Sequence, residues 1–172
     1  MTKKAIFAFG RFNPPTIGHR LMINKMIAEA NNMGADPFIV VTHTQDKKKN
    51  PLKINEKKKV LEKMYPLVPI LATSKEEPNP KYIVTKLKEM KYNNISMMVG
   101  SDRAKSFGWV GIPIRVGGKR NSTKKGAVSM SATMAREAAL ANDKNKFRKS
   151  IDKKIPNKNI NALMKTIKNR MI

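Results

Sequence analysis

The chain alternates short, continuous apolar runs with longer segments whose apolar residues recur every three or four positions. The apolar runs are bounded by glycine, proline or polar residues and predict buried strands at 4–9, 37–43, 67–73, 94–100 and 112–118. The amphipathic segments between them predict helices at 18–33, 54–65, 79–91 and 131–143. Strands that are apolar throughout and are separated by helices indicate a parallel sheet covered on both faces. We therefore expect an α/β fold, a Rossmann-like, doubly wound parallel sheet of about five strands.

Local signals refine these elements. Asn79 and Pro80 predict the cap and the first residue of the third helix. In the first helix we expect Leu21, Met22, Met26 and Ile27 on the buried face. The strand at 67–73 is interrupted by proline and is therefore predicted to be weak, and a polar loop is expected at 119–126.

The composition changes after Asp143. Residues 144–172 contain ten Lys or Arg and a single acid, Asp152. Their apolar residues still fall at helical spacing, which predicts a basic amphipathic helix with Ile160, Leu163, Met164, Ile167 and Met171 on one face. We expect a main domain over 1–143 and a helical extension over 144–172 that packs on the domain or extends it. The alternative is a helix that binds a partner or nucleic acid.

The net charge of +24, from 36 Lys and Arg against 12 Asp and Glu in 172 residues, implies anionic partners. These would be nucleotides, nucleic acid or an acidic surface. Codon bias toward Lys, Asn and Ile in an AT-rich genome is the alternative explanation, and composition does not separate the two.

The residue content excludes several kinds of site. The chain has no cysteine, which rules out a disulfide framework, a thiolate metal site and a cysteine nucleophile. It has no apolar run long enough to cross a membrane, and its first residues lack the cleavage site of a signal peptide. We expect a soluble, intracellular protein.

The stretch "GRFNPPTIGH" at 10–19 follows the first strand, where ligands bind in open parallel sheets. Gly10 permits close backbone approach, and Pro14 and Pro15 stiffen the loop. Gly18 leaves space beside a helix N-terminus, whose free amides attract phosphate. The stretch lacks the ending of a Walker loop and the spacing of the GxGxxG fingerprint.

Thr16 and His19 lie three residues apart, so a hydroxyl and an imidazole are predicted to converge on one anion. The form G-x-F-N-P-x-T-x-G-H after a strand resembles the (H/T)xGH signature of the nucleotidyltransferase superfamily. That superfamily includes cytidylyltransferases, nicotinamide mononucleotide (NMN) adenylyltransferases and phosphopantetheine adenylyltransferase, and it has a Rossmann-like fold of the HUP type. Threonine stands here in the first histidine position.

A second motif of the superfamily, I-S-S-T-x-x-R, is matched by "MSATMAR" at 130–136, with Ala132 for the second serine. The resemblance implies that Ser131, Thr133 and Arg136 bind the β- and γ-phosphates of a nucleoside triphosphate. Taken alone, Ser131 is a helix cap and Arg136 a solvated charge.

The segment "MMVGSDRAKSFGW" at 97–109 resembles the G-x-D segment of NMN adenylyltransferases. There Asp102 would bind a ribose hydroxyl or the acceptor base. Trp109 either stacks on a planar ring or anchors the core. His43 has no comparable context, and we interpret it mainly as a structural or pocket-wall residue.

The segments "TQDKKKNPLKINEKKK" and "ANDKNKFRKSI" resemble small nucleotidyltransferases carried by bacteriophages. One of Lys47, Lys48 and Lys49 would then meet the acceptor phosphate, and each of them is otherwise a solvated charge.

The resemblance covers residues 4–150 and implies a complete site. Thr16 and His19 would act on the α-phosphate, Arg136 on the outer phosphates, and Trp109 and Lys49 on the acceptor. Mg²⁺ would be held by the nucleotide phosphates and water, with no metal ligand from the chain. The remaining nucleotide-binding residues would be Gly10, Arg11, Phe12, Asn13, Gly18, Gly100, Asp102, Arg103, Ser131 and Thr133.

The implied reaction transfers AMP from ATP to a phosphate-bearing acceptor such as NMN and releases pyrophosphate. A cytidylyltransferase that uses CTP is the alternative chemistry. The rival of another class is a nucleic-acid-binding or virion-associated basic protein that retains the fold. The expected location is the cytoplasm, or a host cytoplasm or virion if a phage encodes the chain. The oligomeric state is left open between a monomer, a homo-oligomer and a viral assembly.

Overall fold

The computed structural model describes residues 2–117 and 131–172, which form two compact units. The sheet unit comprises residues 2–10, 21–43 and 68–117, and the helical unit comprises residues 11–20, 44–67 and 131–172. The loop predicted at 119–126 and Met130 of the second motif lie outside the described residues. The domain boundary expected at residue 143 stays a prediction.

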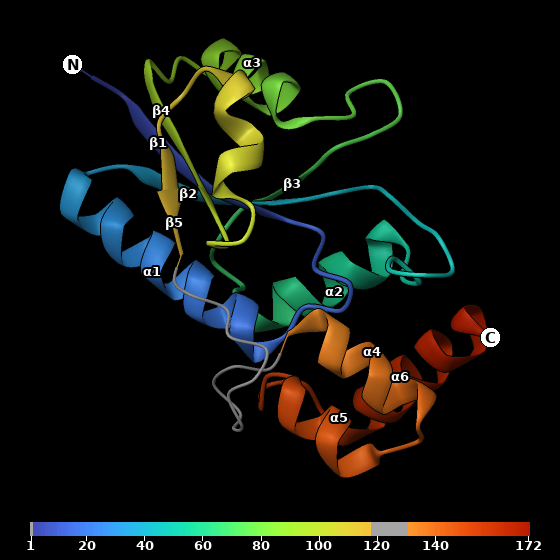
Figure 1. Ribbon diagram of the computed structural model, residues 1–172. Helices are drawn as coiled ribbons and strands as arrows, with labels where there is room; N and C mark the ends of the chain where they lie inside the picture. The colour runs from blue at the N-terminus through green and yellow to red at the C-terminus, as the bar shows by residue number, and fades with distance from the viewer. Residues whose placement is uncertain (1, 118–130) are drawn as a thin grey trace. The chain divides into compact units, whose positions relative to one another are not determined.

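The sheet unit contains five parallel strands in the order β3-β2-β1-β4-β5 (Figure 1). Their bounds are β1 Lys4–Gly10, β2 Asp36–Val41, β3 Ile70–Ala72, β4 Asn94–Val99 and β5 Ile114–Val116. The predicted Rossmann-like α/β fold class is confirmed. Both edge strands begin later than predicted because each follows a proline, Pro69 or Pro113, which has no N–H for the ladder.

Helices cover both faces of this sheet: α1 Ile17–Met33 lies on one face and α3 Pro80–Glu89 on the other (Figure 1). Asn79 caps α3 by accepting the Lys81 N–H, as predicted. The core on the α3 side joins alternate residues of the central strands to α3 and to the 3₁₀ helix η1 Ala104–Val110. Phe9 and Phe107 meet there edge to face, with ring centroids 5.4 Å apart.

The buried stripe of α1 differs from the expected one. Met22, Ile23 and Met26 are buried, whereas Leu21 is 47% exposed. Leu21 was wrongly placed: at about 100° per residue, Met22, Ile23, Met26 and Ala30 fall on one side of the helix and Leu21 falls on the opposite side.

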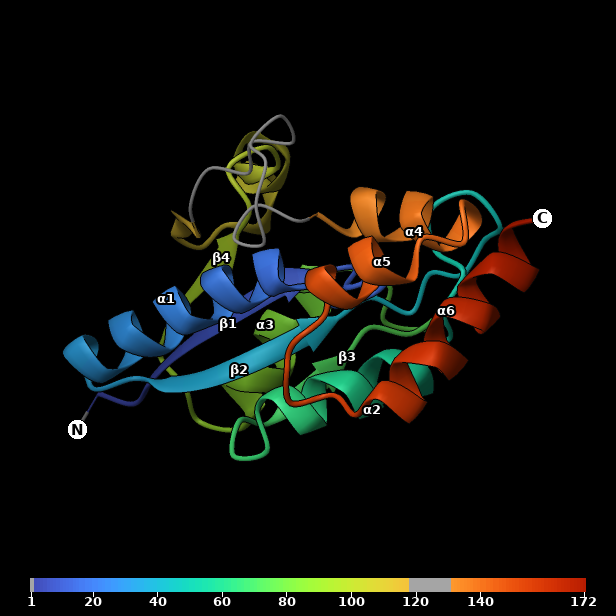
Figure 2. The same cartoon turned by 90° about the horizontal axis from the view of Figure 1, so that it is seen from below.

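The helical unit contains α2 Ile54–Met64, α4 Ala132–Leu140, α5 Lys144–Ser150 and α6 Asn157–Met171. The tail therefore forms two helices where one was predicted, because Asp143 accepts the Lys146 N–H and starts α5. On α6, Ile160, Leu163, Met164 and Ile167 are buried. α6 packs on α4 and α5, and α2 runs beside it (Figure 2). Among the described residues, no helix is both long and apolar enough to span a bilayer.

Replacing Ile167, which is fully buried in α6, tests whether the tail contributes to the fold. Ile167→Ala is expected to lower the free energy of unfolding by about 3 kcal/mol, because it leaves a cavity in a packed interface. Urea denaturation measures the change, and Lys165→Ala at an exposed position of the same helix is the control. Equal stability of both variants would show that α6 does not pack in solution.

Candidate active site

The loop that follows β1 is fastened by Asn13, which is 1% exposed. Its Nδ2 donates to the carbonyl of Leu52 at 3.2 Å, and its Oδ1 accepts the Leu52 N–H at 2.8 Å. The neighbouring Phe12 has a φ of 50°, an uncommon value for a residue with a side chain. The asparagine of the signature thus joins the 11–20 loop to the segment before α2.

The hydrogen bonds around His19 define the tautomer of its imidazole. The Thr16 N–H donates to His19 Nδ1 at 3.0 Å, and Thr16 Oγ1 lies 3.2 Å from the same nitrogen. Because Nδ1 accepts an N–H, the neutral ring carries its hydrogen on Nε2. The Phe12 ring lies against the imidazole, with centroids 4.7 Å apart. The structure therefore brings Thr16 and His19 into contact, as their spacing predicts, and makes Nε2 a donor.

Arg136 joins the two predicted motifs. It is 8% exposed, and its Nη1 donates to the Asn13 carbonyl at 2.8 Å across 123 residues of sequence. Its Nη2 donates to Thr133 Oγ1 at 3.2 Å. Burial lowers the pKa of Arg136, and the charge of Arg11 lowers it further, while Asp46 and Glu137 act in the opposite direction. The second guanidinium nearby makes this a place where an anion would relieve repulsion.

The two hydroxyls at the start of α4 both have partners inside the protein. Ser131 is the N-cap, and its Oγ accepts the Met134 N–H at 3.2 Å. Thr133 Oγ1 accepts from Arg136, as described above. The capping role of Ser131 is therefore observed, whereas Arg136 is not a solvated helix charge. Each hydroxyl keeps a hydrogen that it can donate to a phosphate oxygen.

The lysine-rich turn at 46–50 is organised by Asp46. Its carboxylate accepts the backbone N–H groups of Lys48, Lys49 and Asn50 and the side-chain amide of Asn50. These bonds, the Lys49 amide first, lower the pKa of Asp46 to about 2. Lys49 is exposed on this turn. Asp46 was not predicted from the sequence, although an aspartate at the start of a polar segment is a turn signal.

Lys57 is a second residue that the sequence analysis missed. Its side chain is fully buried, and its Nζ donates to the Arg11 carbonyl at 2.9 Å. Burial lowers the pKa of Lys57 to about 8. The run of lysines looks like a solvated face, but position 57 shares its face of α2 with Val60, Leu61 and Met64. The spacing of position 57 from these apolar residues was the sequence signal that Lys57 is buried.

The sheet unit holds the other predicted residues. Gly10 ends β1 and Gly100 follows β4, the neighbouring strand, where the strand order reverses. Asp102 is exposed, and the guanidinium of Arg103 lies 5.1 Å from the centroid of the Phe107 ring. The glycines thus stand at the position in the sheet where ligands of this fold class bind.

Trp109 is 51% exposed, with its indole N–H donating to the Ser106 carbonyl at 2.8 Å. The core-anchor alternative for Trp109 is therefore wrong, and Phe107 and Val110 fill the core instead. His43 follows β2, with its Nδ1 2.7 Å from Thr73 Oγ1 beyond β3.

The predicted residues thus divide between the two units. Arg11, Phe12, Asn13, Thr16, Gly18, His19, Lys49, Ser131, Thr133 and Arg136 belong to the helical unit, and Gly10, Gly100, Asp102, Arg103 and Trp109 to the sheet unit. Over residues 2–117 and 131–172, no cluster of three His, Asp or Glu has the arrangement of a metal site.

Comparison with known proteins supports the fold and gives the family. The family model described as cytidylyltransferase-like matches residues 7–151. A solved structure of Plasmodium falciparum nicotinic acid mononucleotide adenylyltransferase complexed with NaAD is similar, with a TM-score of 0.62, 16% identity and 95% of each chain covered. The same enzyme complexed with APC gives a TM-score of 0.60 at the same identity and coverage. At this identity the likeness shows the fold. No curated protein sequence matches the chain significantly.

The buried amine of Lys57 gives a prediction about pH. Its folded pKa lies below the unfolded one, so between about pH 8 and 10.5 the unfolded state binds more protons. The free energy of unfolding of the wild type, relative to Lys57→Met, should therefore rise across this window, by at most about 1.4 kcal/mol per pH unit. Urea denaturation of both proteins at several pH values measures it. A constant difference would mean that Lys57 is solvated.

Proposed function

The chain belongs to the cytidylyltransferase-like family of nucleotidyltransferases, and we propose that it transfers AMP from ATP to a phosphate-bearing acceptor. The acceptor would be a nucleotide such as nicotinamide mononucleotide, and pyrophosphate would leave. Adenylyl transfer is favoured over cytidylyl transfer because the solved structures named above are adenylyltransferases and because "VGSD" followed by Trp109 resembles that group.

The single observation that carries the proposal is the hydrogen bond from Arg136 to the Asn13 carbonyl. It brings the C-terminal motif to the loop that contains Thr16 and His19. The same unit then offers a guanidinium fork, a second guanidinium from Arg11 and an imidazole N–H. Such a set of donors and positive charges suits a triphosphate.

In the proposed reaction an oxygen of the acceptor phosphate attacks the α-phosphorus of ATP. A new phosphorus–oxygen bond forms as the bond to the β-phosphate oxygen breaks, and its electron pair leaves with pyrophosphate. The attacking oxygen is already anionic, so the chain needs no general base and no covalent nucleophile. Catalysis rests on positioning and on stabilising charge in the transition state.

Each residue has an assigned task in this scheme. His19 Nε2–H and the Thr16 hydroxyl would donate to the α-phosphate and its bridging oxygen. Arg136, with Ser131 and Thr133, would bind the outer phosphates, where Mg²⁺ supplies further neutralising charge when bound. Lys49 would meet the acceptor phosphate.

Contacts to ribose and base are proposed from the resemblance alone. Asp102 would bind a ribose hydroxyl or the acceptor base, and the exposed ring of Trp109 is suited to stacking. The backbone at Gly10 and Gly100 would pass close to the nucleotide.

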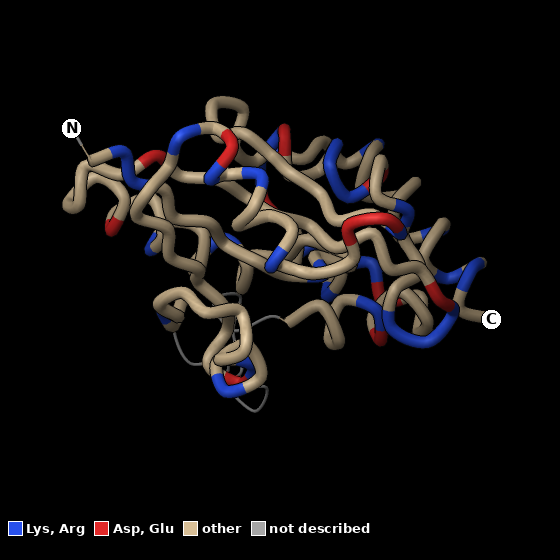
Figure 3. Tube along the Cα trace, turned by 90° about the horizontal axis from the view of Figure 1, so that it is seen from above, with Lys and Arg blue, Asp and Glu red and all other residues tan. Residues whose placement is uncertain are grey.

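A second candidate function is nucleic-acid binding, because the net charge of +24 exceeds what a small metabolite requires. Lys and Arg recur along the described helices and loops, with fewer Asp and Glu between them (Figure 3). Both functions can coexist in one chain.

The catalytic proposal predicts pyrophosphate release with Mg²⁺ and one pair from ATP or CTP with NMN, nicotinate mononucleotide, phosphocholine or phosphopantetheine. His19→Ala should lower kcat roughly 100- to 1,000-fold, because one donor to the reacting phosphate is lost. Leu67→Ala, at a position that is 94% exposed, is the matched control. If the folded wild type released no pyrophosphate with any pair in the panel, transfer to these acceptors would be refuted.

The nucleic-acid candidate predicts binding to double-stranded DNA that weakens steeply as salt is raised. If six phosphates are neutralised, the affinity should fall by about 10³-fold between 50 and 200 mM salt. Fluorescence anisotropy with labelled DNA measures this dependence. An affinity that does not change with salt concentration, or no binding at 150 mM salt, would refute nucleic-acid binding as a function.

A further inference from the structure

The helix α6 lies beyond residues 7–151, the part of the chain that the family model matches. Near its end, Arg170 reaches the segment that precedes and begins α2. Its Nη1 donates to the Pro51 carbonyl at 3.1 Å, and its guanidinium binds both carboxylate oxygens of Glu56, with Nη2 at 3.1 Å from Oε2. A bidentate pair of this kind fixes direction as well as distance.

Glu56 is also part of the start of α2. Its Oε1 accepts the Lys53 N–H at 2.8 Å, which satisfies one of the amides at the helix N-terminus. Burial raises the pKa of Glu56, but the bonds from Arg170 and Lys53 outweigh it and lower the pKa overall. Glu56 is therefore ionised at neutral pH, and Arg170 holds a charged carboxylate.

The other end of α2 is held by the tail as well. Lys154, which precedes α6, donates from Nζ to the carbonyl of Met64, the last residue of α2, at 3.0 Å. A cation at that end also suits the helix dipole. The tail therefore contacts both ends of α2 with basic side chains.

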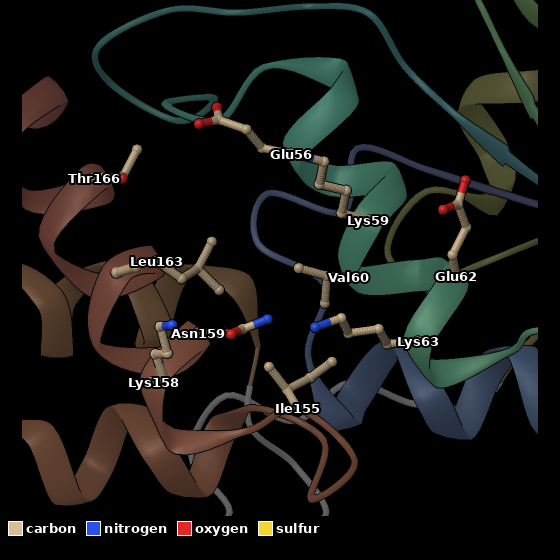
Figure 4. A pocket seen from close by; sticks show the side chains of 11 residues that line it. Glu56, Lys59, Val60, Glu62, Lys63, Ile155, Lys158, Asn159, Leu163 and Thr166 are labelled. Carbon is tan, nitrogen blue, oxygen red and sulfur yellow. The ribbon is translucent and has the colours of Figure 1, made fainter.

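Between these two ends, α2 and α6 border a groove of about 460 Å³ (Figure 4). Val60 of α2 and Ile155 and Leu163 of the tail line it, and Glu56 stands at one end of it, near Thr166.

The anchor segment, defined as residues 51–56, lies directly after the lysine turn at 46–50. One side of the anchor segment is held by Asn13, which binds both backbone groups of Leu52. The other side is held by Arg170 through Pro51 and Glu56. A side chain from the C-terminal helix thus holds the segment that directly follows the lysine turn.

We propose that α6 is a positioning element for the acceptor and that Arg170 is its positioning residue. By holding the anchor segment, Arg170 keeps the 46–50 turn in place, and with it the lysine that meets the phosphate group of the acceptor. The proposal rests on the proposed function for the identity of that ligand. It predicts that loss of Arg170 affects the acceptor more than the nucleoside triphosphate, whose residues Thr16, His19 and Arg136 have their own contacts.

The test compares Arg170→Gln with Lys168→Gln, a charge-matched control on the same helix. Hydrogen exchange of the Lys48, Lys49 and Asn50 amides, which bond to Asp46, should become about fivefold faster or more only in Arg170→Gln, while exchange in the sheet unit stays unchanged. In steady-state kinetics the acceptor KM should rise about fivefold or more, and the KM of ATP should stay within about twofold. Arg170→Lys retains the charge but loses the planar fork, so its exchange rates and its acceptor KM should lie between those of Arg170→Gln and Lys168→Gln.

Two outcomes would overturn the positioning role. One is exchange at the lysine turn equal to that of wild type. The other is an equal rise of both KM values with a general loss of protection, which would mark Arg170 as merely stabilising. The exchange measurement needs no turnover, so it decides the positioning role even where the wild type proves inactive and the proposed function fails.

Discussion

A buried guanidinium is the constraint on which the helical unit depends. Arg136 is almost fully removed from water, and a buried charge is tolerated only when its donors find partners. The Asn13 carbonyl is one of these partners, and the side chain of the same residue binds Leu52. Asn13 therefore links three segments that are distant in sequence: the 11–20 loop, the segment before α2, and α4. Movement of α4 would leave the Arg136 charge without this carbonyl, and movement of the segment before α2 would leave the Asn13 side-chain amide without Leu52.

The fold was predictable because the alternation of apolar runs with amphipathic segments is repeated along the chain. Each central strand is a continuous apolar run, which only a sheet covered on both faces accommodates. The edge strands were predicted to begin too early, because Pro69 and Pro113 directly precede them and cannot donate to the ladder, which the pattern of apolar residues does not reveal. The helix α5 was missed because it is short, and its start depends on the cap at Asp143 more than on periodicity.

The candidate site was predictable where residues act locally. Thr16 and His19 are three positions apart, and the helical turn alone brings them together. Asp46 and Lys57 were missed although each had a local signal, whereas Arg170 had none. Lys57 sits in a run of lysines where most positions are solvated, and the pairing of Arg170 with Glu56 spans 114 residues. No local pattern in the sequence predicts that Arg170 pairs with Glu56, because the chain contains many similar charges and only the tertiary packing determines which of them meet.

The large positive charge has consequences that follow from where the cations bind. Lys57, Arg136 and Lys154 donate to backbone carbonyls, which are neutral, so these charges contribute to the fold without being cancelled. Counting basic residues therefore overestimates the number of side chains that are available to nucleic acid. The net field remains positive all the same, and it attracts polyphosphates to the protein. The cations that stabilise the loops of this chain therefore also raise the local concentration of phosphate-bearing anions around it.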